Sequence, residues 1–164
     1  MINVKYADRQ SGVVLLEALI AILIFSLGVL TIVAIQATSI KLTTDAKYRT
    51  NATLLANRLI GQMWTASGNL TTLKANFDSV TSGAGYATWL AEVQQPDGLP
   101  GVVSGRTCTR PDSTTPVSIL PRVTVNNATG VDAGRVTVWL YWRTPEMDAD
   151  KCHALVVASQ IVRN

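Results

Sequence analysis

One apolar run near the N-terminus limits what this chain can fold into more than any other feature. The run covers positions 13–35 of 164 residues, and every residue in it is apolar or small except Glu17. As a helix it reaches about 34 Å, which is enough to cross the hydrocarbon core of a bilayer. The apolar part of a secretory signal is shorter, roughly 7–15 residues. The sequence therefore predicts a retained membrane-spanning helix.

The charges around the run predict its orientation and leave one carboxylate to explain. Lys5 and Arg9 come before the run, with Asp8 between them, so the positive-inside rule keeps the N-terminus in the cytoplasm. A charge at mid-membrane costs roughly 2.5–3.5 kcal/mol. Glu17 lies only about one helical turn into the run, so its cost is lower, and it either reaches the headgroup level or has a function.

The residues around Glu17 resemble a known processing signal. Gly12 is followed by "VVLLE", which is similar to the class III signal of type IV pilins and type II secretion pseudopilins. In that signal a short charged leader ends in glycine, and a glutamate stands at the fifth place after the cut. The resemblance implies that prepilin peptidase removes residues 1–12 by cutting between Gly12 and Val13, and that Val13 is then N-methylated. It also implies that Glu17 pairs with the N-terminal amine of a neighbouring subunit during filament assembly.

The helical pattern continues beyond the apolar run. Apolar residues recur at helical spacing and so share one face of a helix; they are Tyr48, Ala52, Leu55, Ala56, Leu59 and Met63. The cluster "TASGN" at 65–69 is a stop signal. We expect one continuous helix with a membrane-spanning half over 13–35 and an amphipathic half over 36–65 that packs on a sheet.

The rest of the chain predicts a small β-rich domain, so the expected fold class is α+β. Residues 66–105 are rich in glycine and form a connecting region with one short helix over 86–95. Three segments within 106–164 have strand character and predict an antiparallel sheet of three or four strands: 118–126, 134–144 and 152–162. In the middle strand, alternation places Trp139 and Tyr141 on the face opposite to Val138 and Leu140. That aromatic face is either an exposed adhesive patch or a packing surface.

The chain has two cysteines, Cys108 and Cys152. An even number of cysteines in a segment outside the cytoplasm favours a disulfide bond, and the alternative is a pair of buried free thiols. A bridge here closes a loop of about 45 residues, for which chain-entropy arguments give about 4 kcal/mol of stabilisation. It would join the connecting region to the last strand, and a C-terminal disulfide is also similar to the pilin pattern.

The charged residues do not predict a nucleic-acid interface, and we expect neither enzymatic activity nor a cofactor or metal ion. The net charge is +3, and basic and acidic residues are interspersed along the C-terminal half: Arg106, Arg110, Arg122, Arg135 and Arg143 among Asp112, Asp132, Glu146, Asp148 and Asp150. This predicts a mixed solvated surface. His153 follows Cys152, but neighbouring residues on a strand point to opposite faces, which argues against a shared catalytic or metal site. The acidic run "EMDAD" at 146–150 lacks the glycine and terminal glutamate of a calcium loop.

Within the pilin superfamily, the first 65 residues most resemble PilV-type minor pilins, the type IV pilus modification proteins. The segments that carry this resemblance are "LLEALIAILIFSLGVL", "IQATSIKL" and "ANRLIGQMW", with "GLPG" further on. The resemblance implies a low-abundance subunit that primes pilus assembly in the bacterial inner membrane and enters the fibre or its tip. Its partners would be other minor pilins, the major pilin, prepilin peptidase, the inner-membrane assembly machinery and membrane lipid.

Three alternatives stay open at this point. A minor pseudopilin of type II secretion has a similar helix with a glutamate. A membrane-anchored periplasmic binding domain that never polymerises would need neither Gly12 nor Glu17. A single-pass membrane enzyme would need a catalytic constellation, for which the sequence gives no motif.

Overall fold

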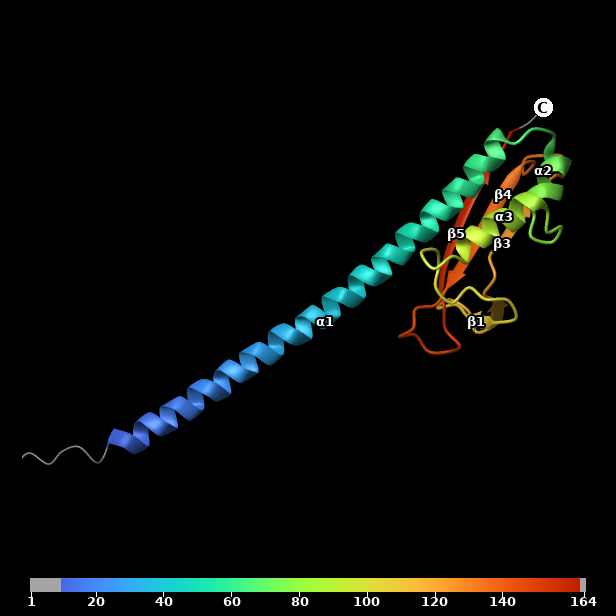
Figure 1. Cartoon of the computed structure of the whole chain (residues 1–164). Coiled ribbons are helices and arrows are strands. Elements are labelled where there is room, and N and C mark those ends of the chain that lie inside the picture. Colours follow the sequence, from blue (N-terminus) through green and yellow to red (C-terminus); the bar gives the residue numbers. More distant parts are fainter. Residues whose placement is uncertain (1–9, 163–164) are drawn as a thin grey trace, which may run out of the picture. The chain divides into compact units, whose positions relative to one another are not determined.

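In the computed structural model, which describes residues 10–162, a long helix is followed by two short helices and five strands (Figure 1). The first helix, α1, extends over Gln10–Thr65. The chain divides into two compact units, Met1–Thr44 and Asp45–Asn164, and each is described by itself. The predicted leader residues Lys5, Asp8 and Arg9 lie outside the described residues.

In the first unit, α1 is exposed and apolar on all sides over most of its length. Every side chain from 12 to 43 is exposed, and the large apolar ones between Val13 and Leu42 are 43–72% exposed. By length and composition the helix suits a membrane span, a single membrane anchor or a signal sequence. A helix that is hydrophobic all round needs lipid or protein around it, and this agrees with the prediction for 13–35.

In the second unit, α1 presents the predicted stripe to the core. Ala52, Ala56, Leu59 and Met63 are completely buried, and Tyr48 and Leu55 pack against them at the margin. The apolar residues at helical spacing therefore identify the packed face correctly. The helix ends at Thr65, close to its predicted end, before a turn at Gly68 with a φ of 103°.

The connecting region contains two helices rather than the one expected. The predicted helix at 86–95 is α3, which covers Ala84–Val93, and α2 covers Leu70–Phe77. The α2 helix was not predicted because its eight residues are too few for a clear hydrophobic period, and only Leu73 and Phe77 of it are buried. Its start signal is local: the Asn69 side chain accepts a 3.0 Å hydrogen bond from the Thr72 backbone N–H, as an N-cap residue does.

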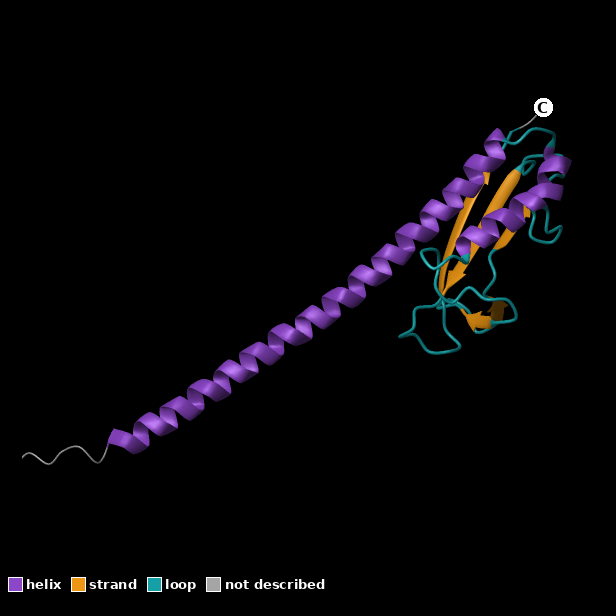
Figure 2. Cartoon of the chain, viewed as in Figure 1, coloured by secondary structure: helices purple, strands orange, loops and turns teal. Residues whose placement is uncertain are grey.

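The main sheet has three antiparallel strands in the order β3-β4-β5 (Figure 2). They cover Arg122–Val125, Arg135–Trp142 and His153–Gln160. The inner face packs with α1 and α3 in one core, to which it contributes Val123, Val136, Val138 and Leu140. The α+β fold class and the three-stranded meander are confirmed. The first strand is shorter than predicted and begins directly after Pro121, which has no N–H to donate to a strand pair.

A second, two-stranded antiparallel sheet was not expected. Its strands are β1, Thr107–Thr109, and β2, Pro116–Ser118. Three-residue strands give no alternation long enough to recognise, and the sequence analysis placed Ser118 in the following strand. A small cluster beside this sheet buries Tyr141 and Ile119 together with both cysteines, and Trp139 packs at its edge. The ring of Tyr141 therefore packs in this cluster, and Trp139 stays half-buried.

A buried carboxylate joins the connecting region to the main sheet. Asp78 is only 4% exposed. Its two carboxylate oxygens accept hydrogen bonds of 2.9 Å from the Val80 N–H and 3.1 Å from the Val125 N–H. The side chain therefore satisfies the backbone of a turn and of β3 at once, which compensates for its own desolvation.

Candidate functional site

The predicted cleavage bond lies in the first turn of α1. The helix begins at Gln10, so Gly12 is its third residue. A Cβ added at Gly12 would meet no atom within 4 Å, and the next side chain, Val13, is 66% exposed. The Gly12–Val13 bond is thus not covered by other side chains of the described residues.

Glu17 lies one helical turn after Val13 on the same side of α1. Residues four apart on a helix are surface neighbours, with Cβ atoms about 5–6 Å apart. The Glu17 side chain is exposed, and no ion pair joins it to another side chain of residues 10–162. An amine created on Val13 would therefore stand within reach of this carboxylate in the same chain, and a neighbouring chain would have to compete for it.

The hydroxyl groups in the apolar part of α1 are satisfied within the helix. Ser26 donates to the carbonyl oxygen of Ile22 at 2.7 Å, Thr31 donates to Leu27 at 2.9 Å, and Thr38 also donates to the carbonyl four residues before it. Lipid offers no alternative partner, so polar groups in a membrane must be satisfied internally. The sequence analysis passed over these residues, although serine and threonine within an apolar run are the visible signal.

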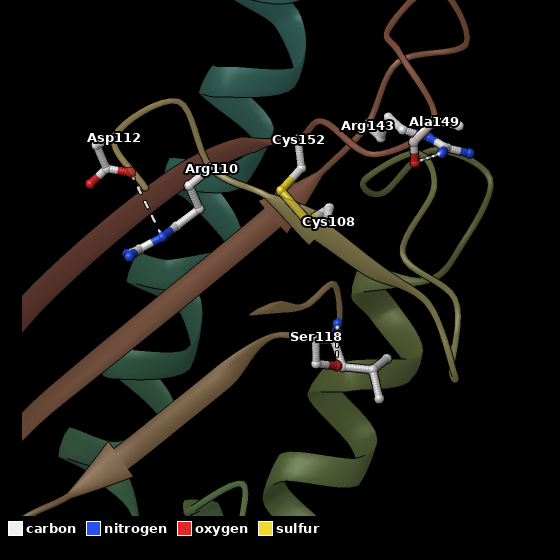
Figure 3. The surroundings of a disulfide bond; sticks show 8 residues. Cys108, Arg110, Asp112, Ser118, Arg143, Ala149 and Cys152 are labelled. Atoms are coloured by element: carbon white, nitrogen blue, oxygen red, sulfur yellow. Dashed lines mark hydrogen bonds and ion pairs between the residues drawn. A yellow bond between two sulfur atoms is a disulfide. The ribbon is translucent and has the colours of Figure 1, made fainter. Parts of the chain in front are cut away.

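A disulfide bond joins Cys108 and Cys152 (Figure 3), with a Cα–Cα distance of 5.7 Å. Both residues are almost completely buried. The backbone reinforces the link, because the Thr109 N–H donates to the Asp150 carbonyl oxygen and the Cys152 N–H donates to the Thr109 carbonyl oxygen. The predicted Cys108–Cys152 bridge is thus present rather than two free thiols; it joins β1 to the residue directly before β5, not the connecting region to the last strand.

His153 is used in packing. Its ring stacks on that of Trp142 with the centroids 5.3 Å apart, and its Nε2 is 3.8 Å from Asp45 Oδ1. Its neighbour Cys152 is held in the disulfide and has no thiol to offer. The two residues therefore do not form a nucleophile and base.

The acidic residues after β4 do not come together in a ligand set. Glu146, Asp148 and Asp150 are all exposed in the loop that leads to β5. Within residues 10–162, no group of three His, Cys, Asp or Glu side chains is placed to hold a metal ion.

An open pocket of about 400 Å³ lies between α1 and α3 in the second unit. Its polar groups mostly pair with one another. Arg58 Nη2 is 3.3 Å from Glu92 Oε1, and the Asn51 side chain donates a 3.1 Å hydrogen bond to the Asp97 carbonyl oxygen. These contacts fasten α3 and the turn after it to α1.

The arginines of the C-terminal half make different kinds of contact, which their spacing in the sequence did not predict. Arg135 forms an exposed pair with Asp132 at 3.1 Å, as expected of a mixed solvated surface. Arg122 instead stands over the ring of Trp139 on the outer face of the main sheet, with 5.3 Å between the guanidinium carbon and the ring centroid. The sequence could not show this contact, because it depends on the pairing of β3 with β4.

Comparison with protein-family models, characterised proteins and solved structures gives no match to this chain. The order of its parts is nevertheless that of a pilin: a long apolar N-terminal helix, antiparallel strands and a C-terminal disulfide.

Proposed function

We propose that this chain is a minor pilin that helps to prime a type IV pilus and enters the fibre. The single observation that carries the proposal is the uncovered Gly12–Val13 bond in the first turn of a fully exposed apolar helix, with Glu17 one turn further on. The pilin-like order of the remaining elements supports it. The subunit then acts by assembly rather than by catalysis and needs no cofactor.

The exposed helix supports assembly as well as anchoring. The apolar side chains of 13–42 require a continuous apolar environment, which lipid provides before assembly and neighbouring helices provide afterwards. In this proposal the chain spans the bacterial inner membrane with its N-terminus in the cytoplasm. Its partners are other minor pilins, the major pilin, prepilin peptidase and the inner-membrane assembly machinery.

In this proposal Glu17 supplies the specificity of the assembly contact between chains. In a low-dielectric environment an unpaired carboxylate is costly, so an ammonium group on a neighbouring chain stabilises the assembled form. N-methylation of Val13 would preserve the positive charge. Val13 and Glu17 of one chain also share a helix face. In the fibre, pairing of Glu17 with the amine of a neighbouring chain therefore replaces its pairing with the amine of its own chain.

Mass spectrometry of the mature N-terminus tests the proposal. We expect a chain that starts at a methylated Val13, and an intact Met1 in the membrane fraction would refute the proposal. Gly12→Val should leave the leader in place. Gly28→Val is the matched control, since a Cβ at Gly28 also meets no atom within 4 Å, and it should be processed normally.

A deletion strain separates the pilus from the related secretion system. Loss of surface pili with normal secretion of enzymes supports the minor pilin. Loss of secreted enzymes with normal pili would support a minor pseudopilin of type II secretion instead.

A further inference from the structure

The outer face of the main sheet gathers two arginines and two aromatic rings beside the disulfide. Arg122 on β3 is paired in register with Trp139 on β4. Tyr141 is two residues further along β4, so it points to the same face of the sheet. Arg110 follows Cys108 by two residues, and Cys108 packs with Tyr141. Residues from three distant parts of the sequence thus meet at this end of the sheet.

Arg110 turns inward, and its Nε atom has no hydrogen-bond acceptor. Its side chain is 27% exposed, and its Nε atom is buried without a hydrogen-bond partner. The nearest carboxylate oxygen, on Asp112, is 3.7 Å from Nε (Figure 3). That distance allows an ion pair but is too long for a hydrogen bond. The Nε atom is closed off by the protein, so a ligand would meet Arg110 through the exposed part of its side chain.

Arg122 has no carboxylate partner among the described side chains. It is exposed, and its contact with Trp139 uses the face of the guanidinium group rather than its N–H groups. Stacking on a half-buried ring holds the guanidinium group in place, while its N–H edge remains available for a planar or tetrahedral oxyanion.

Tyr141 lies between the two arginines in electrostatic terms. Burial raises the pKa of the Tyr141 phenol, and the positive charges of Arg110 and Arg122 oppose that increase. The Asp112 carboxylate acts in the same direction as burial. The phenol therefore stays protonated near neutral pH and can donate its O–H. Two guanidinium groups against one carboxylate leave this cluster with a net charge of about +1, as both arginines remain protonated.

We propose that Arg110, Arg122 and Tyr141 form a binding site for an oxyanion group on the outer face of the sheet. The ligand carries a phosphate, sulfate or carboxylate group, which accepts from both guanidinium groups and from the phenol. Phosphate and sulfate fit better than carboxylate, because they offer more oxygen atoms to three donor groups. The disulfide holds the segment that carries Arg110 against the sheet, so the site is assembled before a ligand arrives.

NMR of the arginine side chains tests the site directly. The full chain, labelled with ¹⁵N-arginine in neutral dodecyl maltoside micelles, is titrated with sodium phosphate at pH 7 against sodium chloride of equal ionic strength. We expect saturable shifts of the Nε–H signals of Arg110 and Arg122 in phosphate only. Sodium sulfate should give the same shifts, and sodium acetate should give smaller ones. Shifts that do not saturate, or that are equal in chloride, would overturn the proposal.

Variants distinguish binding at this site from nonspecific electrostatic attraction of anions to the chain. Arg122→Gln should remove the saturable shift of Arg110, while Arg135→Gln, the matched change at an exposed arginine paired with Asp132, should leave it unchanged. Tyr141→Phe keeps the packed ring and should weaken phosphate binding about fivefold through the lost hydrogen bond. Near-UV circular dichroism confirms that each variant is folded. Equal losses of binding in Arg135→Gln and Arg122→Gln would contradict the site.

Discussion

The hydroxyl group of Tyr86 on α3 donates a 2.7 Å hydrogen bond to the backbone carbonyl oxygen of Pro121, directly before β3. Both residues are buried, so water cannot replace either partner. Tyr86→Phe leaves the carbonyl unsatisfied and should lower the free energy of unfolding by about 1–2 kcal/mol. Urea unfolding followed by circular dichroism measures the change. A variant as stable as the parent chain would mean that the hydrogen bond contributes nothing.

The same phenol should make stability depend on alkaline pH. Burial raises the pKa of Tyr86 above its ordinary value of 10.0. The native state therefore keeps this proton at a pH where the unfolded chain has lost it. Its contribution is complete below about pH 10 and is lost as the pH rises through the native pKa. We expect the urea midpoint to fall as the pH rises above about 10, and to fall less steeply in Tyr86→Phe. An unchanged slope in that variant would assign the effect to other groups.

The disulfide should contribute a large share of the stability of the second unit. Cys108 and Cys152 are 44 positions apart, and a loop of that size corresponds to about 4 kcal/mol in the chain-entropy description. The double variant Cys108→Ser with Cys152→Ser should unfold at a clearly lower urea concentration. Reduction of the parent chain by dithiothreitol should give the same midpoint as the variant, which controls for the change of side chain. Equal midpoints for the oxidised and reduced parent would contradict this expectation.

The sequence predicts best those parts of the fold that repeat a pattern over many residues. The apolar run, the stripe from Tyr48 to Met63 and the alternation in β4 each contain several residues of one period, and the structure confirms all three. The α2 helix and the β1–β2 sheet were missed because eight-residue and three-residue elements contain too few repeats. Their positions depend on tertiary contacts, such as the hydrogen bond from the Val125 N–H on β3 to Asp78 directly after α2 and the packing of Cys108 on β1 with Tyr141.

The candidate sites also differ in whether a local sequence pattern could predict them. Gly12, Val13 and Glu17 lie within less than two turns of one helix, and their spacing alone places them together. The cluster of Arg110, Arg122 and Tyr141 depends on strand pairing and on the disulfide. No local pattern marks such a cluster, and the sequence showed only arginines mixed with acidic residues.

The role proposed for Glu17 predicts a defect in assembly rather than in folding or insertion. Glu17→Gln removes the charge and keeps the size of the side chain. The variant should insert and be processed normally but reach sheared fibres poorly, as measured by immunoblots of fibre and membrane fractions. Glu17→Asp, which keeps the charge, should recover part of the incorporation, and Ser26→Ala, which changes another exposed position of α1, should have no effect. Normal incorporation of Glu17→Gln would refute the role.

Alanine substitutions at two glycines with nearly the same φ distinguish the cost of backbone strain from the cost of steric overlap. Gly134 and Gly105 have φ values of 72° and 77°, so alanine is strained at both, at roughly 1–2 kcal/mol. At Gly134 an added Cβ would lie 2.0 Å from the Ile161 carbonyl oxygen, whereas at Gly105 it meets nothing within 4 Å. Gly134 N–H also donates to the Asn126 carbonyl oxygen, and its own carbonyl accepts from Ile161 N–H, so the backbone has little room to move away. We therefore expect Gly134→Ala to lower the urea midpoint much more than Gly105→Ala, and equal effects would show that the overlap is relieved without cost.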